Sequence, residues 1–368
     1  MRRLPLSAVK AGMVLARPIY GPDGQLWLNA GVILKETYLE SLKHTNVTHV
    51  YVGDPLLWDV VVDKVVSDET RAMAVKTVKK TLQEMKTGVL QNGRFIDNRF
   101  FFTVEKLVQE ILHNRDVIYN LDDIRTADDY TFCHSVNVCI LALMIANELR
   151  MPRRQLEELA VGALLHDVGK IYVNQAILKK EGSLSPEEYE EIKKHPVYGY
   201  DILSQQKNIA FDSIKVVAQH HERCDGSGYP LQLCGEDIHD YAKLVMIADV
   251  FDALTANRPY RKAMRPDEAI EIITGSTHLY DMDMIRAFIF RVAAFPVGTA
   301  VRLSNDDMGI VIKTHKGMPL RPVVRVCKRG DGTFYPRPYD LDLTEALDLV
   351  IKDVLSDEER ELEMPISM

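Results

Sequence analysis

Residues 155–170, QLEELAVGALLHDVGK, are expected to form a helix whose buried face ends in polar side chains. Leu156 and Leu159 mark an apolar stripe with the spacing of three and four that is typical of a buried helix face. Continuing that phase places three polar residues on the same inward face: His166, Asp167 and Lys170. A lone His-Asp pair is more often a surface pair or a helix cap, but buried polar groups must find partners. The pattern therefore favours a buried site.

Two further segments with helical spacing also carry ligand-type side chains. Residues 212–221, DSIKVVAQHH, have an apolar face and end in His220 and His221, which on a helix point about 100° apart and can face two different ions. Residues 241–254, YAKLVMIADVFDAL, are apolar nearly all round, with Asp249 in the middle. A buried carboxylate needs a cation, which is either a metal ion or a buried Arg or Lys. Asp252, one turn later, is expected to orient a histidine ring.

Two more histidines complete the candidate set. His195 is expected at the end of a helix that opens with the capping box beginning at Ser185, and His134 near the start of an apolar helix. Alone, each would more often be an ordinary core or cap histidine. Together the candidates are five histidines and two aspartates, more than the four ligands of a structural zinc site. They suit two divalent ions with open positions for water and substrate, bridged by Asp167.

The rest of the chain indicates a mainly α protein with β-rich ends. Residues 1–54 predict a small β-rich module, with a hairpin between Val14–Tyr20 and Leu26–Leu28, a helix near Lys35–His44 and a strand at Thr48–Val52. Helices are expected over Val60–Met85 and Val104–Leu112, and short β runs after residue 298. We therefore expect four parts: the module at 1–54, a helical packing segment at 55–125, a catalytic domain at 126–293 and a β-containing extension at 294–368.

Composition restricts the class of partners. The formal net charge of −8 argues against a protein that coats DNA or RNA, while leaving room for a small anionic substrate held by local Arg and Lys. The five cysteines form no CxxC pair, which indicates reduced thiols and a cytoplasmic protein. The longest apolar run, Val138–Ala146, is too short to cross a bilayer, so we expect no membrane association. Homodimerisation through the helices of residues 60–115 is a further expectation.

The ordered motifs resemble those of the HD-GYP family, a branch of the HD phosphohydrolases, from about residue 128 to 263. They stand as HDVGKI at 166–171, HHERCDGSGYP at 220–230, GE at 235–236, ADVFDALT at 248–255 and RPYRKA at 258–263. The resemblance implies an all-helical domain that cleaves cyclic di-GMP to linear pGpG or GMP. It also implies two divalent ions, Fe or Mn, held by these residues: His134, His166, Asp167, His195, His220, His221 and Asp249. Lys170 would face the scissile phosphate, and Tyr229, Arg258 and Arg261 would contact the substrate.

Two positions depart from the family pattern. Members that bind a third ion carry a Glu one turn before the first His, where this chain has Tyr130. We therefore predict a two-metal site. Cys224 replaces the aromatic residue that usually follows His-Glu-Arg; we expect this either to alter how the nearby loop packs or to make the site sensitive to oxidation, without removing a ligand.

The expected reaction is attack of a metal-bridging hydroxide on phosphorus, with Lys170 and the two arginines offsetting the developing charge. Tyr229 has two candidate roles, a hydrogen bond to phosphate or stacking on guanine, and RPYRKA alone would be read as a solvated basic turn. Three alternatives stay open: an HD hydrolase for another nucleotide, a different cyclic dinucleotide as substrate, and a non-catalytic sensor or scaffold.

Overall fold

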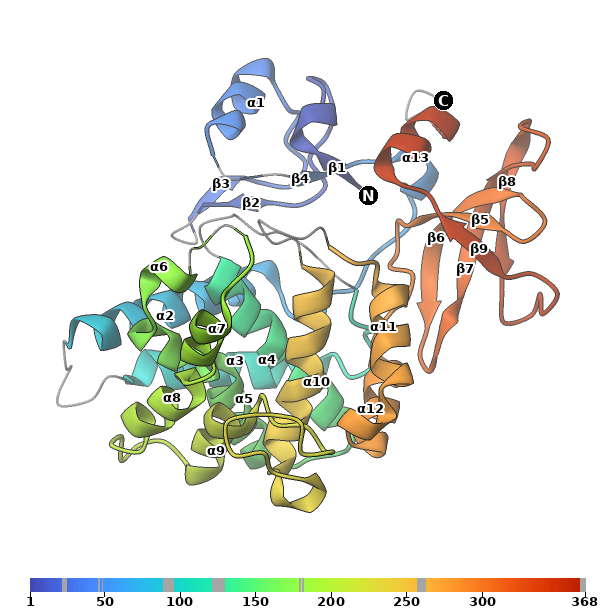
Figure 1. Cartoon of the computed structure of the whole chain (residues 1–368). Helices are drawn as coiled ribbons and strands as arrows, with labels where there is room; N and C mark the ends of the chain where they lie inside the picture. Colours follow the sequence, from blue (N-terminus) through green and yellow to red (C-terminus); the bar gives the residue numbers. More distant parts are fainter. Residues whose placement is uncertain are drawn as a thin grey trace. The chain divides into compact units, whose positions relative to one another are not determined.

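A computed structural model of the chain divides into two compact units, which are described separately (Figure 1). One unit comprises residues 1–64, 118–130 and 292–368, and the other comprises residues 65–117 and 131–291. The structure describes residues 1–21, 25–45, 47, 49–88, 96–120, 130–178, 180, 182–256 and 263–364.

The second unit is helical, and the first holds short strands from both ends of the chain, which confirms the expected mainly α class with β-rich ends. The α-helices of the second unit are α2 (Asp68–Thr87), α3 (Asn98–His113), α4 (Tyr130–Glu148), α5 (Arg153–Leu165), α6 (Gln175–Leu178), α7 (Pro186–Ile192), α8 (His195–Leu203), α9 (Phe211–Gln219), α10 (Asp240–Thr255), α11 (Pro266–Gly275) and α12 (Met282–Arg291). Three short 3-10 helices join them: η4 (Val168–Tyr172), η5 (Gly235–Asp237) and η6 (Thr277–Leu279).

Helices α4 and α10 form the core of the helical unit. The side chains from Val138 to Ala146 in α4 are 0–1% exposed, and most of α10 is equally buried. The segment Thr131–Glu148 is long and apolar enough to cross a membrane by length and composition, but 72% of it is buried inside the structure. Burial on all sides explains why neither helix has a polar face.

Helix α2 begins eight residues later than the sequence predicts. The expectation of a helix from Val60 is wrong, because Ser67 caps a helix that starts at Asp68 and accepts a hydrogen bond from the amide of Thr70. Glu110 of α3 stabilises this first turn. Its carboxylate accepts hydrogen bonds from the Ser67 amide at 2.6 Å and from the Ser67 and Thr70 hydroxyls. α3 is longer than expected and is capped by Asp97.

The N-terminal part of the first unit contains two small antiparallel sheets. β1 (Arg2–Pro5) pairs with β4 (His49–Val52), and β2 (Ile19–Tyr20) pairs with β3 (Leu26–Leu28). The η1 turn (Leu6–Ala8), helix α1 (Glu36–Lys43) and η2 turn (Pro55–Leu57) complete it. The expected hairpin pairing is present, although its first strand covers only two residues, and the turn at Pro22–Gly24 lies outside the described residues.

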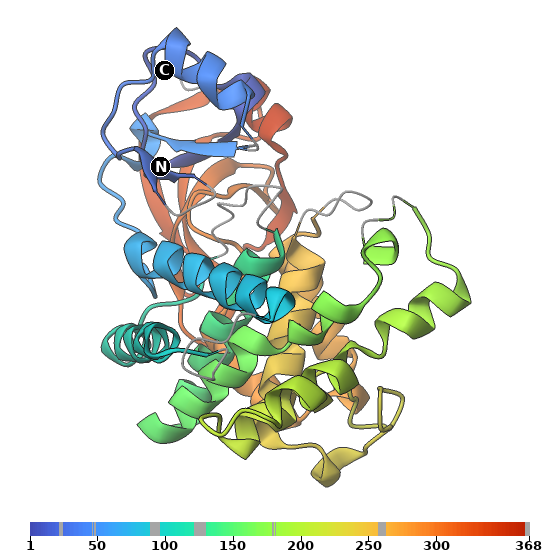
Figure 2. The same cartoon turned by 90° about the vertical axis from the view of Figure 1, so that its left-hand side faces the viewer.

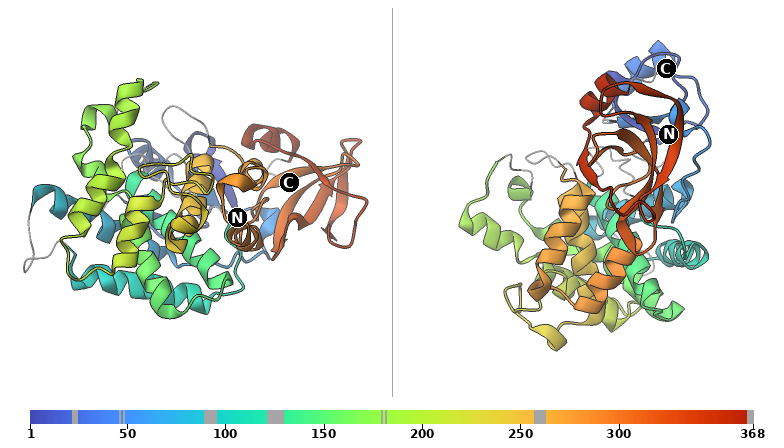
Figure 3. Two further views of the ribbon diagram at one scale, coloured as in Figure 1. Left: turned by 60° about the horizontal axis from the view of Figure 1, so that its bottom comes forward. Right: turned by 90° about the vertical axis from the view of Figure 1, so that its right-hand side faces the viewer.

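The C-terminal part of the first unit is a five-stranded antiparallel sheet in the order β8-β7-β6-β5-β9. Its elements are β5 (Ala300–Leu303), β6 (Met308–His315), β7 (Met318–Lys328), β8 (Phe334–Asp342), β9 (Ile351–Val354) and α13 (Asp357–Glu363). The orange and red strands curl around one another in the right-hand view of Figure 3. A buried ion pair between Arg360 and Asp54, 2.6 Å long, joins this part to the N-terminal segment.

Candidate metal centre

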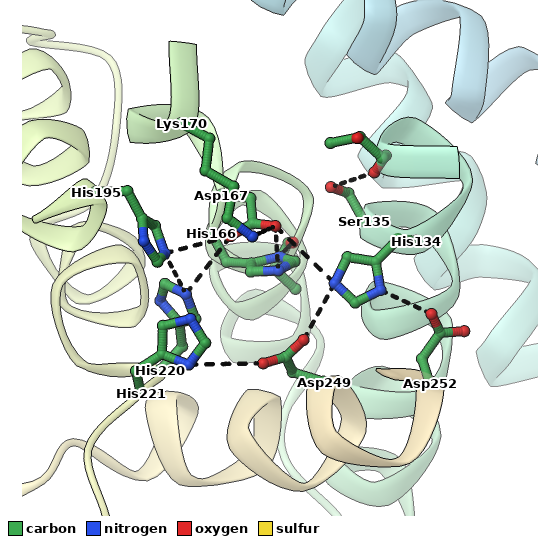
Figure 4. Close-up of polar contacts among 12 residues, drawn as sticks. His134, Ser135, His166, Asp167, Lys170, His195, His220, His221, Asp249 and Asp252 are labelled. Atoms are coloured by element: carbon green, nitrogen blue, oxygen red, sulfur yellow. Dashed lines mark hydrogen bonds and ion pairs between the residues drawn. The ribbon is translucent and has the colours of Figure 1, made fainter. Parts of the chain in front are cut away.

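Five elements of the helical unit bring the candidate ligands together (Figure 4). In Figure 4, Asp167 lies between His195 and His220 on one side and His134 on the other. The contributions are His134 from α4, His166 and Asp167 from the α5–η4 junction, His195 from α8, His220 and His221 from the end of α9, and Asp249 from α10. All these side chains are buried, His221 less completely than the rest.

The His-Asp pair does not lie inside a continuous helix. The expectation of one helix through Lys170 is wrong, because α5 ends at Leu165, His166 is its C-cap, and η4 begins at Val168. The tighter turn of the 3-10 helix changes the direction of successive side chains, so the inward placement of Asp167 is set by the junction itself.

Gly169 explains why η4 and α8 can approach each other. A Cβ at this position would lie 1.9 Å from the carbonyl oxygen of His195, a distance no larger residue tolerates. This close approach brings His195 Nε2 to 3.3 Å from Asp167 Oδ1. His195 itself begins α8, so the expectation that it ends the preceding helix is also wrong; α7 ends at Ile192, three residues earlier.

Hydrogen bonds at Nδ1 orient four of the imidazoles. His166 Nδ1 lies 2.8 Å from Ala163 O, His195 Nδ1 lies 2.7 Å from Ile192 O, and His220 Nδ1 lies 3.0 Å from Val217 O. His134 Nδ1 lies 2.7 Å from Asp252 Oδ2, as expected for Asp252. Carbonyl and carboxylate oxygens only accept, so Nδ1 of each ring carries a proton and Nε2 is the nitrogen that faces the cluster.

The cluster consists of two ligand groups that share Asp167. One group is Asp167, His195, His220 and His221, and the other is His134, His166 and Asp167; within each group the ligand atoms lie within 4.8 Å of one another. Asp249 joins the second group, with Oδ1 3.1 Å from His134 Nε2, and reaches the first through His221 Nδ1 at 3.8 Å.

The donor set fits metal ions. Among the described residues, His166 Nε2 and Asp167 Oδ1 are buried atoms without a hydrogen-bond partner. His195 Nε2 and His220 Nε2 face each other at 3.2 Å, although the Nδ1 proton of each ring leaves both as lone pairs. Buried acceptors that converge in this way require a cation between them.

The charge states also suit metal binding. Burial holds the pKa of His220 and of His221 well below the usual value, against an opposing effect of Asp249 on His221, so both are neutral at pH 7. Burial opposes ionisation of Asp167 and Asp249, yet both pKa values are held well below normal, by Lys170 and histidines at Asp167 and by histidines alone at Asp249. Burial likewise opposes charge on His134, but Asp249 and Asp252 raise its pKa to about 9. A metal ion would therefore displace a proton from His134.

The structure describes two of the four residues that are expected to contact the substrate, Lys170 and Tyr229. Lys170 Nζ lies 2.6 Å from Asp167 Oδ2 and is about one-third exposed, so it reaches both the cluster and solvent. The Tyr229 ring stacks on His221, with centroids 4.7 Å apart, and its amide donates to His221 O. Arg258 and Arg261 lie outside the described residues, as does the side chain of Tyr130.

Sequence reasoning missed the role of Glu222, which is fully buried. Its carboxylate accepts from the amides of Leu231 and Leu233 at 2.7 and 3.0 Å, and so holds the loop that carries Tyr229. Gly228 lies against Glu222, because a Cβ there would be 2.3 Å from Glu222 Cα. A charged residue directly after two buried histidines was the available signal.

Comparison with known proteins agrees with this geometry. Residues 108–284 match the family described as HD domain, and residues 300–363 match the KOW domain associated with HD domain. A cyclic di-GMP phosphodiesterase of Pseudomonas aeruginosa is 35% identical over 223 residues, covering 61% of this chain and 54% of that protein. A cyclic di-GMP phosphodiesterase of Thermotoga maritima is 36% identical over 192 residues, covering 52% and 51%. A 3'3'-cGAMP-specific phosphodiesterase of Vibrio cholerae is 38% identical over 152 residues, covering 40% and 32%.

The helical unit and its His-Asp cluster thus define an HD-domain protein. Within that class, the motifs that stand in order from residue 166 to residue 263 are similar to those of the HD-GYP type. The chain spans about half the length of the first two relatives.

Proposed function

We propose that this chain is a cyclic-di-GMP phosphodiesterase that uses two divalent ions, Fe or Mn. The observation that carries the proposal is the pair of ligand groups around the shared carboxylate of Asp167, with Lys170 beside it. The proposed ligands are His134, His166, Asp167, His195, His220, His221 and Asp249. Relatives named for this activity support the choice of substrate.

The ions, when bound, would supply Lewis acidity and lower the pKa of a coordinated water. The protein residues would position and neutralise the substrate. The Lys170 ammonium, already paired with Asp167, can donate to a phosphate oxygen while it stays beside the cluster. Burial raises the pKa of Tyr229, so its hydroxyl stays protonated and can donate as well.

Stacking on His221 occupies one face of the Tyr229 ring, which favours the phosphate role over stacking on guanine. We propose that the Tyr229 hydroxyl donates to a phosphate oxygen. We propose that Arg258 and Arg261 bind the same phosphates. They belong to the RPYRKA motif, and this basic segment follows the helix that carries Asp249.

A second substrate has specific support. Relatives from Vibrio cholerae are named 3'3'-cGAMP-specific phosphodiesterases, and two of them are 38% and 35% identical over 152 and 184 residues of this chain. We therefore propose 3'3'-cGAMP as the second candidate substrate. A non-catalytic sensor is less favoured, because the full ligand set is present.

The test is hydrolysis by anaerobically purified protein of known metal content. Cyclic di-GMP and 3'3'-cGAMP would be supplied side by side, and linear and mononucleotide products followed. The His166→Ala/Asp167→Ala variant should lose activity, whereas His315→Ala, far from the cluster in sequence and paired with Asp342, should keep it. No turnover of either substrate by Fe- or Mn-loaded protein would exclude the enzyme, and a binding titration would then test the sensor alternative.

The remaining assignments are also proposals. We propose that the protein acts in the cytoplasm, that residues 126–293 form the catalytic domain between a helical segment at 55–125 and an extension at 294–368, and that residues 1–54 form a separate module. We propose a homodimer through the helices of residues 60–115. A single monomeric species across concentrations in light scattering would disprove the dimer.

A further inference from the structure

A continuous chain of hydrogen bonds runs from α2 to the candidate ligand His134. Arg71 Nη1 donates to Asn137 Oδ1, Asn137 Nδ2 donates to Asp252 Oδ1 at 3.0 Å, and Asp252 Oδ2 accepts from His134 Nδ1 at 2.7 Å. We propose that Arg71 and Asn137 are positioning residues that act through Asp252 to set the metal affinity at His134. The inference rests on the metal centre of the proposed function.

Each link has a direction that follows from chemistry. A guanidinium only donates, so the amide oxygen of Asn137 must face Arg71 and the amide NH2 must face Asp252. A carboxylate only accepts, so the remaining oxygen of Asp252 keeps the proton of His134 on Nδ1. Nε2, the nitrogen left for a metal ion, then faces Asp249 Oδ1 at 3.1 Å and Asp167 Oδ2 at 4.0 Å. Arg71 is thus linked to His134 through two intervening residues, Asn137 and Asp252, and helps to hold the Asp252 carboxylate against the ring.

Burial makes the chain of contacts costly to break. Asn137 and His134 are each 5% exposed and Asp252 is 2% exposed, so water cannot replace a lost partner at these positions. Without Arg71, the buried amide oxygen of Asn137 loses its partner, and the amide is no longer held from that side against the Asp252 carboxylate. Asp252 would then be held less firmly, and with it the His134 ring.

Arg71 lies outside the part of the chain that matches the HD domain. It belongs to α2, which precedes residue 108 and is the light-blue helix at the front of the helical unit in Figure 2. Arg71 directly follows Thr70, in the helix turn that Ser67 caps and to which Glu110 is hydrogen-bonded. The position of Arg71 therefore depends on how the start of α2 is held. By linkage, any change that moves α2 would alter metal affinity, and metal binding would hold α2 in place.

The experiment measures Mn²⁺ affinity of the metal-free full-length protein by competition with a fluorescent chelator. We expect Arg71→Met to weaken one Mn²⁺ equivalent roughly tenfold, and Asn137→Asp, which sets a carboxylate against Asp252, to weaken it roughly 10- to 100-fold. The other equivalent should stay within about twofold. Arg71→Lys keeps a hydrogen-bond donor at this position, so it should weaken Mn²⁺ binding less than Arg71→Met does. Lys76→Met, which removes a charge from the exposed side of the same helix, is the matched control and should change nothing.

Four results would be decisive. If Arg71→Met and Asn137→Asp are folded by circular dichroism and bind both equivalents like the wild type, the inference is wrong. If both equivalents weaken together, the residues have only a structural role, and the inference also fails. The double variant should be no weaker than Asn137→Asp alone, because both act through Asp252. Wild-type protein that binds no Mn²⁺ or Fe²⁺ would instead refute the metal centre and the proposed function.

Discussion

At the residue scale, the site depends on hydrogen bonds made away from the metal positions. The Nδ1 atoms of His166, His195 and His220 are held by carbonyls of the preceding turns, so three rings are oriented by their own segments. His134 differs, because its partner Asp252 comes from another helix. The orientation of this ring is therefore the most sensitive to changes elsewhere in the fold.

The Tyr229→Phe variant removes the hydroxyl but keeps the ring, so it tests the role of the hydroxyl alone. The ring can still stack on His221, so we expect Mn²⁺ affinity to be unchanged. Loss of one hydrogen bond to a charged phosphate should lower kcat/KM for cyclic di-GMP roughly 10- to 100-fold. Steady-state kinetics with Tyr339→Phe, on β8, as control would measure this. An unchanged kcat/KM would assign Tyr229 a packing role.

Glu222→Gln tests how the Tyr229 loop is held. The amide of glutamine can accept from only one of the two backbone N–H groups that Glu222 now binds, so one buried donor loses its partner. We expect KM for cyclic di-GMP to rise roughly tenfold, with Mn²⁺ affinity nearly unchanged. Glu271→Gln, at an exposed position of α11, is the control. A variant that lost Mn²⁺ binding without a rise in KM would contradict this role.

At the element scale, the ends and contacts of helices place the ligands. His166, His195 and His220 all lie at helix ends, where the backbone direction changes and where one helix meets another. α5 and α9 lie especially close at Gly162, where a Cβ would be 2.7 Å from Val216 and 2.8 Å from Ser213 O. The position of His220 at the end of α9 depends on that contact.

Gly162→Ala should therefore push α9 away from α5. We expect a loss of about 1–3 kcal/mol in the free energy of unfolding, because the core is overpacked, and weaker Mn²⁺ binding because His220 moves. Urea unfolding and the chelator competition would measure the two effects. Gly275→Ala meets nothing within 4 Å and should be neutral or slightly stabilising. Equal stability of the two variants would show that α5 and α9 can adjust without cost.

At the scale of the whole molecule, the two units are built from different parts of the chain. The ends of the chain meet in the first unit, where Arg325 binds Asp59 and Asp340, and Arg360 binds Asp54. The candidate ligands all belong to the helical unit. Both tryptophans, Trp27 and Trp58, belong to the first unit, so fluorescence and helical circular dichroism report on different units.

Metal removal should distinguish the units. An ion present at one hundred times its Kd stabilises the fold that binds it by about 2.7 kcal/mol, and a chelator removes this stabilisation. We expect the chelator to lower the Tm seen by far-UV circular dichroism and to leave the Trp fluorescence transition in place. The His166→Ala/Asp167→Ala variant should show no response. Equal shifts of both signals would mean that the units unfold together.

The sequence by itself determined which residues form the candidate site. The spacing of apolar residues identified the buried face ending in His166 and Asp167, and the apolar surroundings of Asp249 required a cation there. These features could be predicted because a helix repeats every 3.6 residues, so the pattern of one segment reports which side chains face inward. Pro196, directly after His195, is a local sign that a helix begins there, because proline favours the first turn of a helix.

Tertiary structure alone decided how the segments meet. Three features have no sign in the local sequence: the end of α5 at Leu165, the close approach of Gly169 to His195, and the hydrogen bonds that lead from Arg71 to Asp252. Periodicity states that a side chain is buried but not what it touches. Contacts between segments distant in the sequence are set by how whole helices pack, and no local pattern contains that information.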